Sequence, residues 1–303
     1  MPSTAHSDSS AGMSRRDFLS LAGRVAALWG LSSTALPSLA ASLEALSTGR
    51  VPVLWLEGSN CSGCSISLLN SYPVLPLSVL TRHLSLQFHQ TLSTIQGAPA
   101  VELVDDTIAR GGYVLVTEGA VPTTIPSACR FGGENFGDHL LRAAQAATHV
   151  VAVGSCAAFG GIPAAPNNPT GAVDSITFPQ SKGVAKPFVR VPGCPPHPDW
   201  MIGTLVHLIQ YGVPPLDSQL RPLKFFSKTV HSMCRCRKWR TPALPVPGLH
   251  GGIRLQGPST YADCVSRGWN GVATSCLQSH APCIGCTSAN FGKSSFHHWP
   301  VAQ

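Results

Sequence analysis

The stretch Val51–Leu69, VPVLWLEGSNCSGCSISLL, sets the pattern around which the rest of the chain is organised. A short apolar run leads into a turn with Cys61 and Cys64, and an apolar segment of helical composition follows. A Cys-x-x-Cys pair alone fits a zinc knuckle, a thiol redox pair, a disulfide or half of an iron–sulfur site. The stretch therefore predicts a strand, a cysteine turn and a helix, and on its own leaves the role of the cysteines open.

The same order of features occurs twice more. The segments THVVAVGSC and KPFVRVPGC each lead from a valine-rich run into one cysteine, Cys156 and Cys194. Short β-branched runs bounded by Gly or Pro are typical of strands buried on both faces of a parallel sheet. The carboxyl ends of such strands share one edge, where ligands bind at a topological switch point. Four thiolates at that edge can ligate one cubane cluster, so the pattern favours an iron–sulfur site.

The remaining segments continue an alternation of strands and helices, which predicts a doubly wound α/β fold. We expect strands at 85–89 and 113–120, helices at 98–110, 138–148 and 201–211, a Gly-rich turn at 157–161 and a loop at 168–171. From about Pro222 the chain becomes rich in Cys, His, Gly, Pro and Ser and loses periodicity. That region is expected to fold around its ligands rather than around an apolar core.

Composition limits the possible partners. The chain has 303 residues, enough for two domains, and only 12% of them are charged. The net charge is +7, but the basic residues are scattered except in the group 235–240. Because no long basic stripe or RNA-binding aromatic motif is present, we expect no nucleic-acid partner.

The N-terminal segment, residues 1–47, is predicted to be a targeting leader. Ser14–Leu19, SRRDFL, matches the twin-arginine signal and is followed by a mildly apolar stretch, with a cleavage site expected near Ala40 or Ala41. That route exports proteins already folded around a cofactor, which is compatible with eleven cysteines in an oxidising compartment. No second apolar stretch of membrane length follows, so we expect a periplasmic protein that reaches the membrane only through a partner.

A second group of possible metal ligands lies after residue 222. Its members are His231, Cys234, Cys236, Cys264, Cys276, Cys283 and Cys286. Their spacing alone fits zinc and iron–sulfur ligation about equally. The cysteines of the first region favour iron–sulfur, because a lone structural zinc does not explain two cysteine-rich regions in one exported chain.

Taken together, these motifs make the chain resemble the small subunit of the nickel–iron hydrogenases over nearly all its length. The motifs, in family order, are WLEGSNCSGC, VTEGAVP, GSCAAFGG, NPTGA, VPGCPPHPDW, RPLKFFSKTVHSMC, GPSTYADC and HAPCIGC. The resemblance implies a flavodoxin-like domain, 48–221, and a small irregular iron–sulfur domain, 222–303. It also implies that hydrogen is activated on a separate large subunit, and that this chain passes electrons to an acceptor such as a cytochrome or a membrane iron–sulfur partner.

The resemblance also assigns ligands. For a proximal 4Fe-4S cluster it implies Cys61, Cys64, Cys156 and Cys194. For a medial cluster it implies Cys264, Cys283 and Cys286, and for a distal cluster His231 and Cys234. It implies no catalytic residue on this chain.

Two departures from the family pattern concern the outer clusters. Cys276 stands where most relatives have Pro, so we predict a medial 4Fe-4S cluster in place of a 3Fe-4S cluster; a free thiol is the alternative. At the distal site, Leu249 and Leu255 fall where the family has its last two cysteines. Either Cys236, with or without His250, rebuilds an altered 4Fe-4S site, or the distal cluster is missing.

The proximal turn has smaller departures. Gly63 is the ordinary residue between the two cysteines, and Cys129 lacks the companion found in oxygen-tolerant relatives, so an ordinary cubane is expected. Ser62 keeps a hydroxyl where the family has Thr, and Ile66 replaces a Glu.

Three other functions stay open at this point. The first is a related redox module, such as the iron–sulfur subunits of NADH:quinone oxidoreductases, although these lack the second cysteine region. The second is a degenerate paralogue that no longer relays electrons. The third is an exported protein stabilised by zinc or disulfides.

Overall fold

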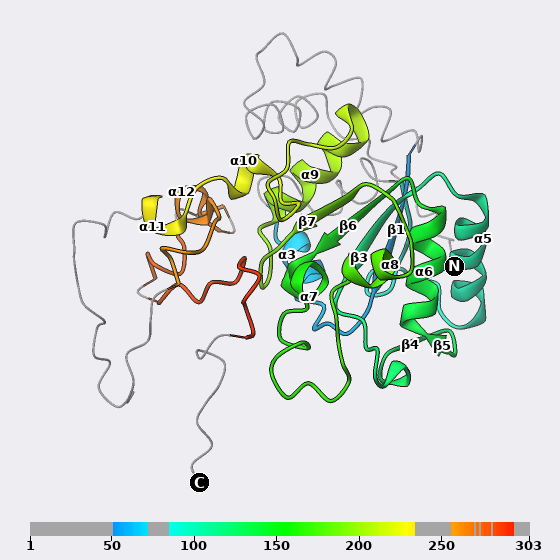
Figure 1. The fold of residues 1–303 in the computed structure, drawn as a ribbon. Helices are drawn as coiled ribbons and strands as arrows, with labels where there is room; N and C mark the ends of the chain where they lie inside the picture. Colours follow the sequence, from blue (N-terminus) through cyan, green and yellow to red (C-terminus); the bar gives the residue numbers. More distant parts are fainter. Residues whose placement is uncertain are drawn as a thin grey trace, which may run out of the picture.

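A five-stranded parallel sheet forms the centre of the molecule (Figure 1). The computed structural model describes residues 51–71, 85–233, 256–269, 271–272, 274–279 and 281–293. The strands are β1 (Pro52–Glu57), β2 (Ser85–His89), β3 (Val114–Glu118), β6 (His149–Val153) and β7 (Phe188–Val191). Their order, β2-β1-β3-β6-β7, is that of a flavodoxin-like sheet. The predicted fold class is therefore confirmed.

Helices cover both faces of the sheet. The main ones are α3 (Gly63–Leu69) and α9 (Pro198–Tyr211) on one face, and α5 (Ala98–Arg110) and α6 (Phe136–Ala146) on the other. Successive residues of β1 alternate between these layers: Val53 and Trp55 pack toward α9, whereas Leu54 and Leu56 pack toward α5 and α6. Because both faces are covered, β1, β3, β6 and β7 are buried along nearly their whole length, as their apolar runs predict, whereas the edge strand β2 is half-buried.

Each predicted strand and helix is present in the described residues, with ends that differ by up to three residues, and one predicted turn is wrong in part. The helix expected at 138–148 runs from Phe136 to Ala146, a shift of the kind common at helix ends. The turn expected at 157–161 is wrong in part, because α7 (Gly154–Phe159) carries the chain through Cys156 in helical form. Only Gly160 and Gly161, both at positive φ, form the turn.

The remaining described elements are short. They are η2 (Pro126–Ala128), the antiparallel pair β4 (Arg130–Phe131) and β5 (Glu134–Asn135), α8 (Thr177–Ser181), α10 (Leu223–Phe226), α11 (Val230–Met233) and α12 (Cys264–Arg267). The described residues after 222 contain only short helices and isolated bridges. Among them, the buried residues Phe225, Phe226, Val230 and Ala262 nevertheless join the core beneath α9, so they extend the apolar layer of the sheet.

Several predictions fall outside the described residues. These are the leader and the possible distal ligands Cys234, Cys236 and His250. Within the described ranges, no helix is both long and apolar enough to cross a membrane.

Candidate metal centres

Four cysteines meet at the carboxyl edge of the sheet, and we call them the proximal group: Cys61, Cys64, Cys156 and Cys194. The first two flank a turn between β1 and α3 in which Ser62 has φ 56°, a left-handed conformation that is uncommon for a residue other than Gly. The third lies in the first turn of α7, directly after β6. The fourth follows β7, after Gly193. The structure thus brings together all four residues that the sequence pattern predicts.

The proximal thiols are close enough to influence one another's ionisation. Burial raises the pKa of Cys64 well above its usual range, and the charges of Glu118 and of the other three thiolates raise it further. Burial and the neighbouring Cys194 raise the pKa of Cys156 to about 12. Thiolates at these positions therefore need a positively charged partner, which a metal or iron–sulfur cluster supplies.

Two glycines let the backbone approach the sulfur atoms of the proximal group closely. A Cβ on Gly154, which has φ +86°, would lie 2.4 Å from Cys64 Sγ. A Cβ on Gly161 would lie 2.9 Å from Cys156 Sγ. Across the described parts of the chain, no three His, Cys, Asp or Glu side chains lie close enough to share a single metal ion. A spread set of four thiols suits a multi-atom cluster better than a preformed zinc site.

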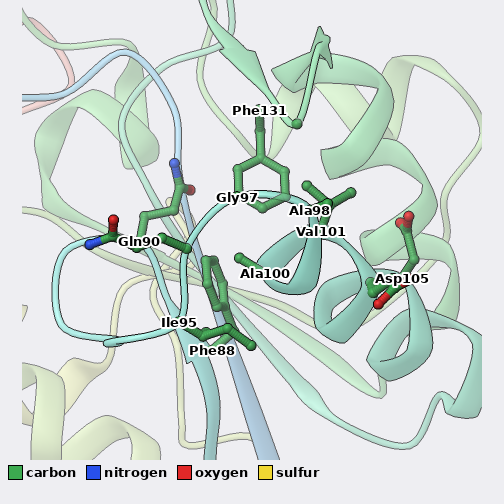
Figure 2. Close-up of a pocket in the computed structure, with 12 residues that line it drawn as sticks. Phe88, Gln90, Ile95, Gly97, Ala98, Ala100, Val101, Asp105 and Phe131 are labelled. Atoms are coloured by element: carbon green, nitrogen blue, oxygen red, sulfur yellow. The ribbon is translucent and has the colours of Figure 1, made fainter.

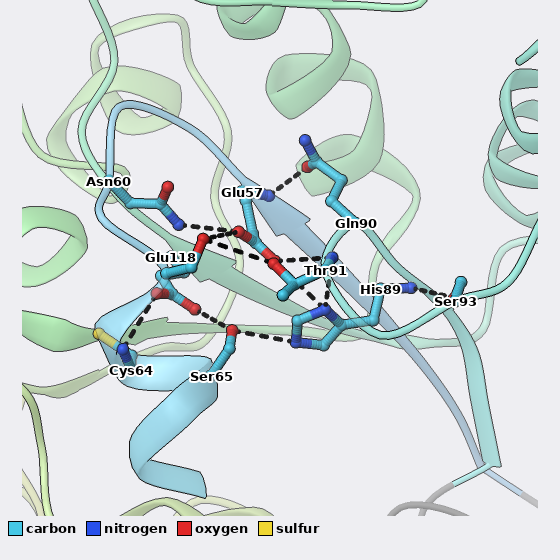
Figure 3. Close-up of polar contacts among 10 residues, drawn as sticks. Glu57, Asn60, Cys64, Ser65, His89, Gln90, Thr91, Ser93 and Glu118 are labelled. Carbon is cyan, nitrogen blue, oxygen red and sulfur yellow. Dashed lines mark hydrogen bonds and ion pairs between the residues drawn. The ribbon is translucent and has the colours of Figure 1, made fainter. Parts of the chain in front are cut away.

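A buried polar network supports the Cys61–Cys64 turn from behind (Figure 3). Glu118 Oε1, at the end of β3, accepts the backbone N–H of Cys64 at 3.1 Å, and its Oε2 accepts the Ser65 hydroxyl at 2.5 Å. His89 Nε2 lies 3.2 Å from the same hydroxyl oxygen. Because the single Ser65 proton goes to Glu118, His89 must donate from Nε2. One carboxylate therefore fixes a cysteine amide, a serine fixes that carboxylate, and a histidine fixes the serine hydroxyl.

The network continues to a second carboxylate, Glu57, at the end of β1. Its Oε1 accepts the hydroxyl of Thr91 at 2.5 Å and lies 3.2 Å from His89 Nδ1. Its Oε2 accepts from the Ser62 hydroxyl at 3.1 Å. Burial lowers the pKa of His89 to about 4, against the attraction of Glu57. Burial raises the pKa of Glu118, which the Ser65 hydrogen bond partly offsets. None of these side chains is itself a predicted ligand, but together they position Cys64, which is one.

Four further cysteines form a second set, which we call the medial group: Cys264, Cys276, Cys283 and Cys286. Burial raises the pKa of Cys264 to about 12, and the neighbouring thiolates of Cys283 and Cys276 add to the effect. Burial also raises the pKa of Cys286, and the charges of the other three thiolates contribute. The structure therefore brings Cys276 to the three cysteines that the family resemblance assigns to a medial cluster.

An ion-pair cluster connects the medial group to the sheet domain. Arg267 donates to Asp199 Oδ2 at 3.1 Å and to both oxygens of Asp263. The indole N–H of Trp200 donates to Asp263 Oδ1 at 2.7 Å. Asp263 and Arg267 bracket the short helix of Cys264, whereas Asp199 and Trp200 begin α9. These contacts, which we call the clamp, fix the second cysteine site relative to the first.

Two predicted residues and one pocket lie apart from these groups. His231 is exposed in α11, where its backbone N–H donates to Gly257, and its distal role stays a prediction. Cys129 lies near Ser59, whose hydroxyl it contacts, and joins neither group. An open pocket of about 700 Å³ lies between Phe88, the start of α5 and Phe131, and no cysteine lines it (Figure 2).

Comparisons with known proteins connect this arrangement to a family. A family profile described as "NADH ubiquinone oxidoreductase, 20 Kd subunit" matches residues 61–208, and one described as the C-terminal part of the "NiFe/NiFeSe hydrogenase small subunit" matches residues 254–297. The periplasmic [NiFeSe] hydrogenase small subunit of Desulfomicrobium baculatum is 36% identical over 94% of this chain and 98% of its own length. The chain belongs to the nickel–iron hydrogenase small-subunit family.

Other hydrogenase small subunits agree with this result. The hydrogenase-2 small chain of Escherichia coli K12 is 33% identical, over 93% of this chain and 78% of its own length. A solved structure of the reduced, active Ni-Fe-Se hydrogenase from D. baculatum has a TM-score of 0.73 at 36% identity, covering 80% of this chain and 95% of that one. The predicted family is thus confirmed. As a hydrogenase small subunit, the chain is the electron-transfer subunit of an oxidoreductase whose active site is on the large subunit.

Sequence reasoning missed the supporting network and the clamp. Glu118 ends a fully buried strand, and a charged residue at such a position is a signal that could have identified it. The contacts of His89 and Ser65 carry no such signal, because the two residues are 24 positions apart and meet only through strand pairing.

Proposed function

We propose that this small subunit relays electrons through two 4Fe-4S clusters, one on the proximal group and one on the medial group. The observation that carries the proposal is the gathering of eight cysteines into two sets of four. Each set is partly buried, and within each set the thiolates raise one another's pKa. When bound, the clusters supply one-electron chemistry, and the chain supplies their ligands and fixes their separation.

The four-cysteine medial set is the finer part of this proposal. Cys276 is exposed, yet its charge acts on Cys264, Cys283 and Cys286, as expected of a fourth ligand. The backbone N–H of Gly285 lies against Cys283 and opposes the rise in its pKa that burial causes, and hydrogen bonds to cluster sulfurs are among the factors that set cluster potentials. In this proposal electrons leave from the medial site, or from an altered distal site that includes His231, Cys234 and Cys236.

The partner and the compartment complete the proposal. Cys61 and Cys194 are exposed, and so are the apolar side chains of Ile66, two residues after Cys64, and Ile162. The backbone N–H of Ile162 donates to Cys156 Sγ, which places this apolar residue directly at the proximal group. This face suits burial against a large subunit that holds the nickel–iron centre. The proposal also includes twin-arginine export to the periplasm, with cleavage near Ala40 or Ala41, and an external acceptor such as a cytochrome or membrane iron–sulfur protein, as the leader and the family suggest.

The decisive measurement is the iron content of the native complex, purified anaerobically, together with its electron paramagnetic resonance spectrum after oxidation. Two cubanes predict about eight irons besides the single iron of the large subunit, and no three-iron signal. About twelve cluster irons would show that a distal cluster has been rebuilt. Zinc in place of iron would overturn the proposal.

A pair of variants separates the fourth medial ligand from an ordinary thiol. Cys276→Ser should leave the proximal cluster intact and produce a three-iron signal, because three cysteines remain at the medial site. Cys129→Ser is the matched control, since Cys129 is a thiol outside both groups, and it should keep the iron content and spectrum of the parent. If Cys276→Ser behaves like Cys129→Ser, Cys276 is not a ligand.

A further inference from the structure

The positive charge of the chain is concentrated in its second cysteine region. From residue 222 onward the sequence has nine Lys and Arg residues and a single acidic residue, Asp263. The preceding 221 residues have twelve Lys and Arg and thirteen Asp and Glu, so the net charge of +7 comes entirely from the last 82 residues. Asp263 pairs with Arg267 in the clamp, so the other eight basic residues have no acidic residue of their own region to neutralise them. A one-sided charge distribution of this kind attracts and orients acidic partners.

Two of these basic residues lie on an exposed surface together with apolar side chains. Leu223 and Lys224 begin α10, and Lys228 follows the end of that helix by two residues. Tyr261 lies against this segment, because the backbone N–H of Ala262 donates to the carbonyl of Lys228 at 3.1 Å. Both lysines are exposed, Leu223 and Tyr261 are each 40% exposed, and within the described ranges neither lysine takes part in an ion pair. We call the surface of Leu223, Lys224, Lys228 and Tyr261 the exit face.

The exit face lies beside the medial group. The backbone carbonyl of Tyr261 accepts the hydroxyl of Thr287, the residue after Cys286, at 2.9 Å. Cys264 follows Tyr261 by three residues. Arg221 supports the ring from the inner side, since it is 6% exposed and its guanidinium lies 5.5 Å from the centre of the Tyr261 ring. Figure 1 shows α10, α11 and α12 together at one end of the molecule, away from α5 and α6. A carrier that docks on the exit face therefore lies next to two proposed medial ligands.

We propose that the exit face is the docking surface for an acidic electron-carrier protein, which takes electrons from the medial site. The proposal rests on the proposed function, because the medial group must hold a cluster. In each encounter one electron leaves the reduced medial site and reduces one oxidised carrier molecule. Two encounters therefore consume the two electrons of each hydrogen molecule, and no proton crosses this surface.

The composition of the exit face fits a protein partner. Complexes of electron carriers are small and short-lived, and charged side chains steer the encounter while apolar ones make the close contact. Lys224 and Lys228 supply the charge, and Leu223 and Tyr261 supply the apolar contact. An anionic membrane surface would attract the same lysines, but it accepts no electron. Moreover, α10 has only four residues, so it presents no amphipathic helix of the kind that lies in a bilayer surface.

The test measures hydrogen-dependent reduction of three acceptors by the intact, anaerobically purified complex at low ionic strength. The acceptors are plastocyanin, an acidic one-electron carrier, mitochondrial cytochrome c, a basic one, and benzyl viologen, a small dye that needs no docking surface. The variant Lys224→Glu/Lys228→Glu reverses the charge of the exit face. Lys182→Glu/Lys186→Glu is the matched control, with the same spacing and the same change in net charge. Between its two positions Val184 packs in the layer of α5 and α6, on the other face of the sheet from α10.

The expected effect is selective for the acidic carrier. The exit-face variant should reduce plastocyanin about tenfold more slowly than the parent, because the steering charge has changed sign. It should keep the iron content, the viologen rate and the cytochrome c rate of the parent. The control variant should match the parent with all three acceptors. Added salt should lower the plastocyanin rate of the parent toward that of the exit-face variant, because salt screens charges at the surface.

The other outcomes distinguish this inference from the proposed function. A parent without iron–sulfur clusters overturns both. Clusters in the parent, with an unchanged plastocyanin rate in the exit-face variant, overturn the docking surface alone. So does an equal loss in the two double variants, since net charge rather than position would then explain it. If the exit-face variant loses only its binding to phosphatidylglycerol vesicles, the partner is a membrane and the proposal is wrong.

Discussion

The proximal and medial groups are both sets of four thiols, but the chain holds them by different means. The proximal cysteines follow strands of one parallel sheet, whose pairing fixes their positions before any ligand is bound. The medial cysteines lie on turns and one short helix, and the described residues around them form no strand longer than an isolated bridge. Backbone pairing thus fixes the positions of the proximal cysteines, whereas the positions of the medial cysteines depend on the clamp and on the cluster proposed to bind there.

Cluster removal gives the largest expected difference between the two sites. After chelation of iron under reducing conditions, residues 256–293 should lose protection from hydrogen exchange, because the described chain there has few backbone hydrogen bonds of its own. The strands at 114–118 and 149–153 should stay protected, since they are central in the sheet. Mass spectrometry of peptides from both regions checks this. Equal loss in both regions would contradict the distinction.

A pair of glycine variants tests the proximal site. Gly154 and Gly183 have almost the same backbone, with φ +86° and +82°, so Ala at either position carries a similar strain of about 1–2 kcal/mol. Only Gly154 faces a ligand, because its added Cβ would lie 2.4 Å from Cys64 Sγ, whereas nothing lies within 4 Å at Gly183. Gly154→Ala should therefore lose about four irons per chain, those of the proximal cubane. Gly183→Ala should keep them.

Iron analysis of the two variants in parallel checks this prediction. If both variants lose iron equally, backbone strain explains the loss, and steric conflict with Cys64 does not.

The clamp is the corresponding weak point of the medial site. Arg267→Met would leave the carboxylates of Asp199 and Asp263 without their cation, and their side chains are only 9% and 19% exposed. Breaking one side of a largely buried ion pair should destabilise the protein by about 2–4 kcal/mol. Arg142→Met is the control, because that arginine pairs with Glu134 at the surface, with exposures of 42% and 54%, and should cost under about 0.5 kcal/mol.

Denaturant unfolding of the two variants measures the difference. The medial cluster should also be lost at lower denaturant concentration in Arg267→Met than in the parent. If the two arginine variants have equal stability, the clamp does not hold the second site.

The same contrast explains how much the sequence could predict. The valine-rich runs and the glycine or proline residues beside the cysteines identify β1, β6 and β7, so the proximal site follows from local pattern and the rules of parallel sheets. We did not predict that Cys156 lies in a helix, because Gly160 and Gly161 indicated a turn that begins at residue 157. The medial ligands follow only from family resemblance, since the chain around them has no periodicity to read.

The clamp and the supporting network could not be predicted, because they depend on contacts between residues far apart in sequence. Trp200 and Asp263 meet across 63 positions, and Cys64 and Glu118 across 54. Their chemistry is ordinary, and only the packing of α9 and β3 brings each pair together.

The smallest expected effect concerns pH, and it belongs to the proximal side of the comparison. The pKa of His89 is about 4 in the folded protein, lowered by burial from an ordinary value of 6.5. Between these values the unfolded chain binds a proton that the folded chain does not, so His89 makes stability fall as pH drops from about 6.5 toward 4. The raised pKa of Glu118 acts in the opposite direction, because its folded form keeps a proton at higher pH than the unfolded form.

His89→Gln should remove only the first of these contributions. From pH 7 to pH 5.5 the cluster-depleted parent should lose about 1 kcal/mol more stability than this variant. Denaturant unfolding followed by circular dichroism at the two pH values measures both slopes. An unchanged slope in His89→Gln would mean that folding does not shift the pKa of His89. A parent that gains stability relative to the variant as the pH drops would mean that His89 is charged in the folded state and pairs with Glu57 at 3.2 Å. The network behind Cys64 would then be an ion pair rather than a chain of neutral donors.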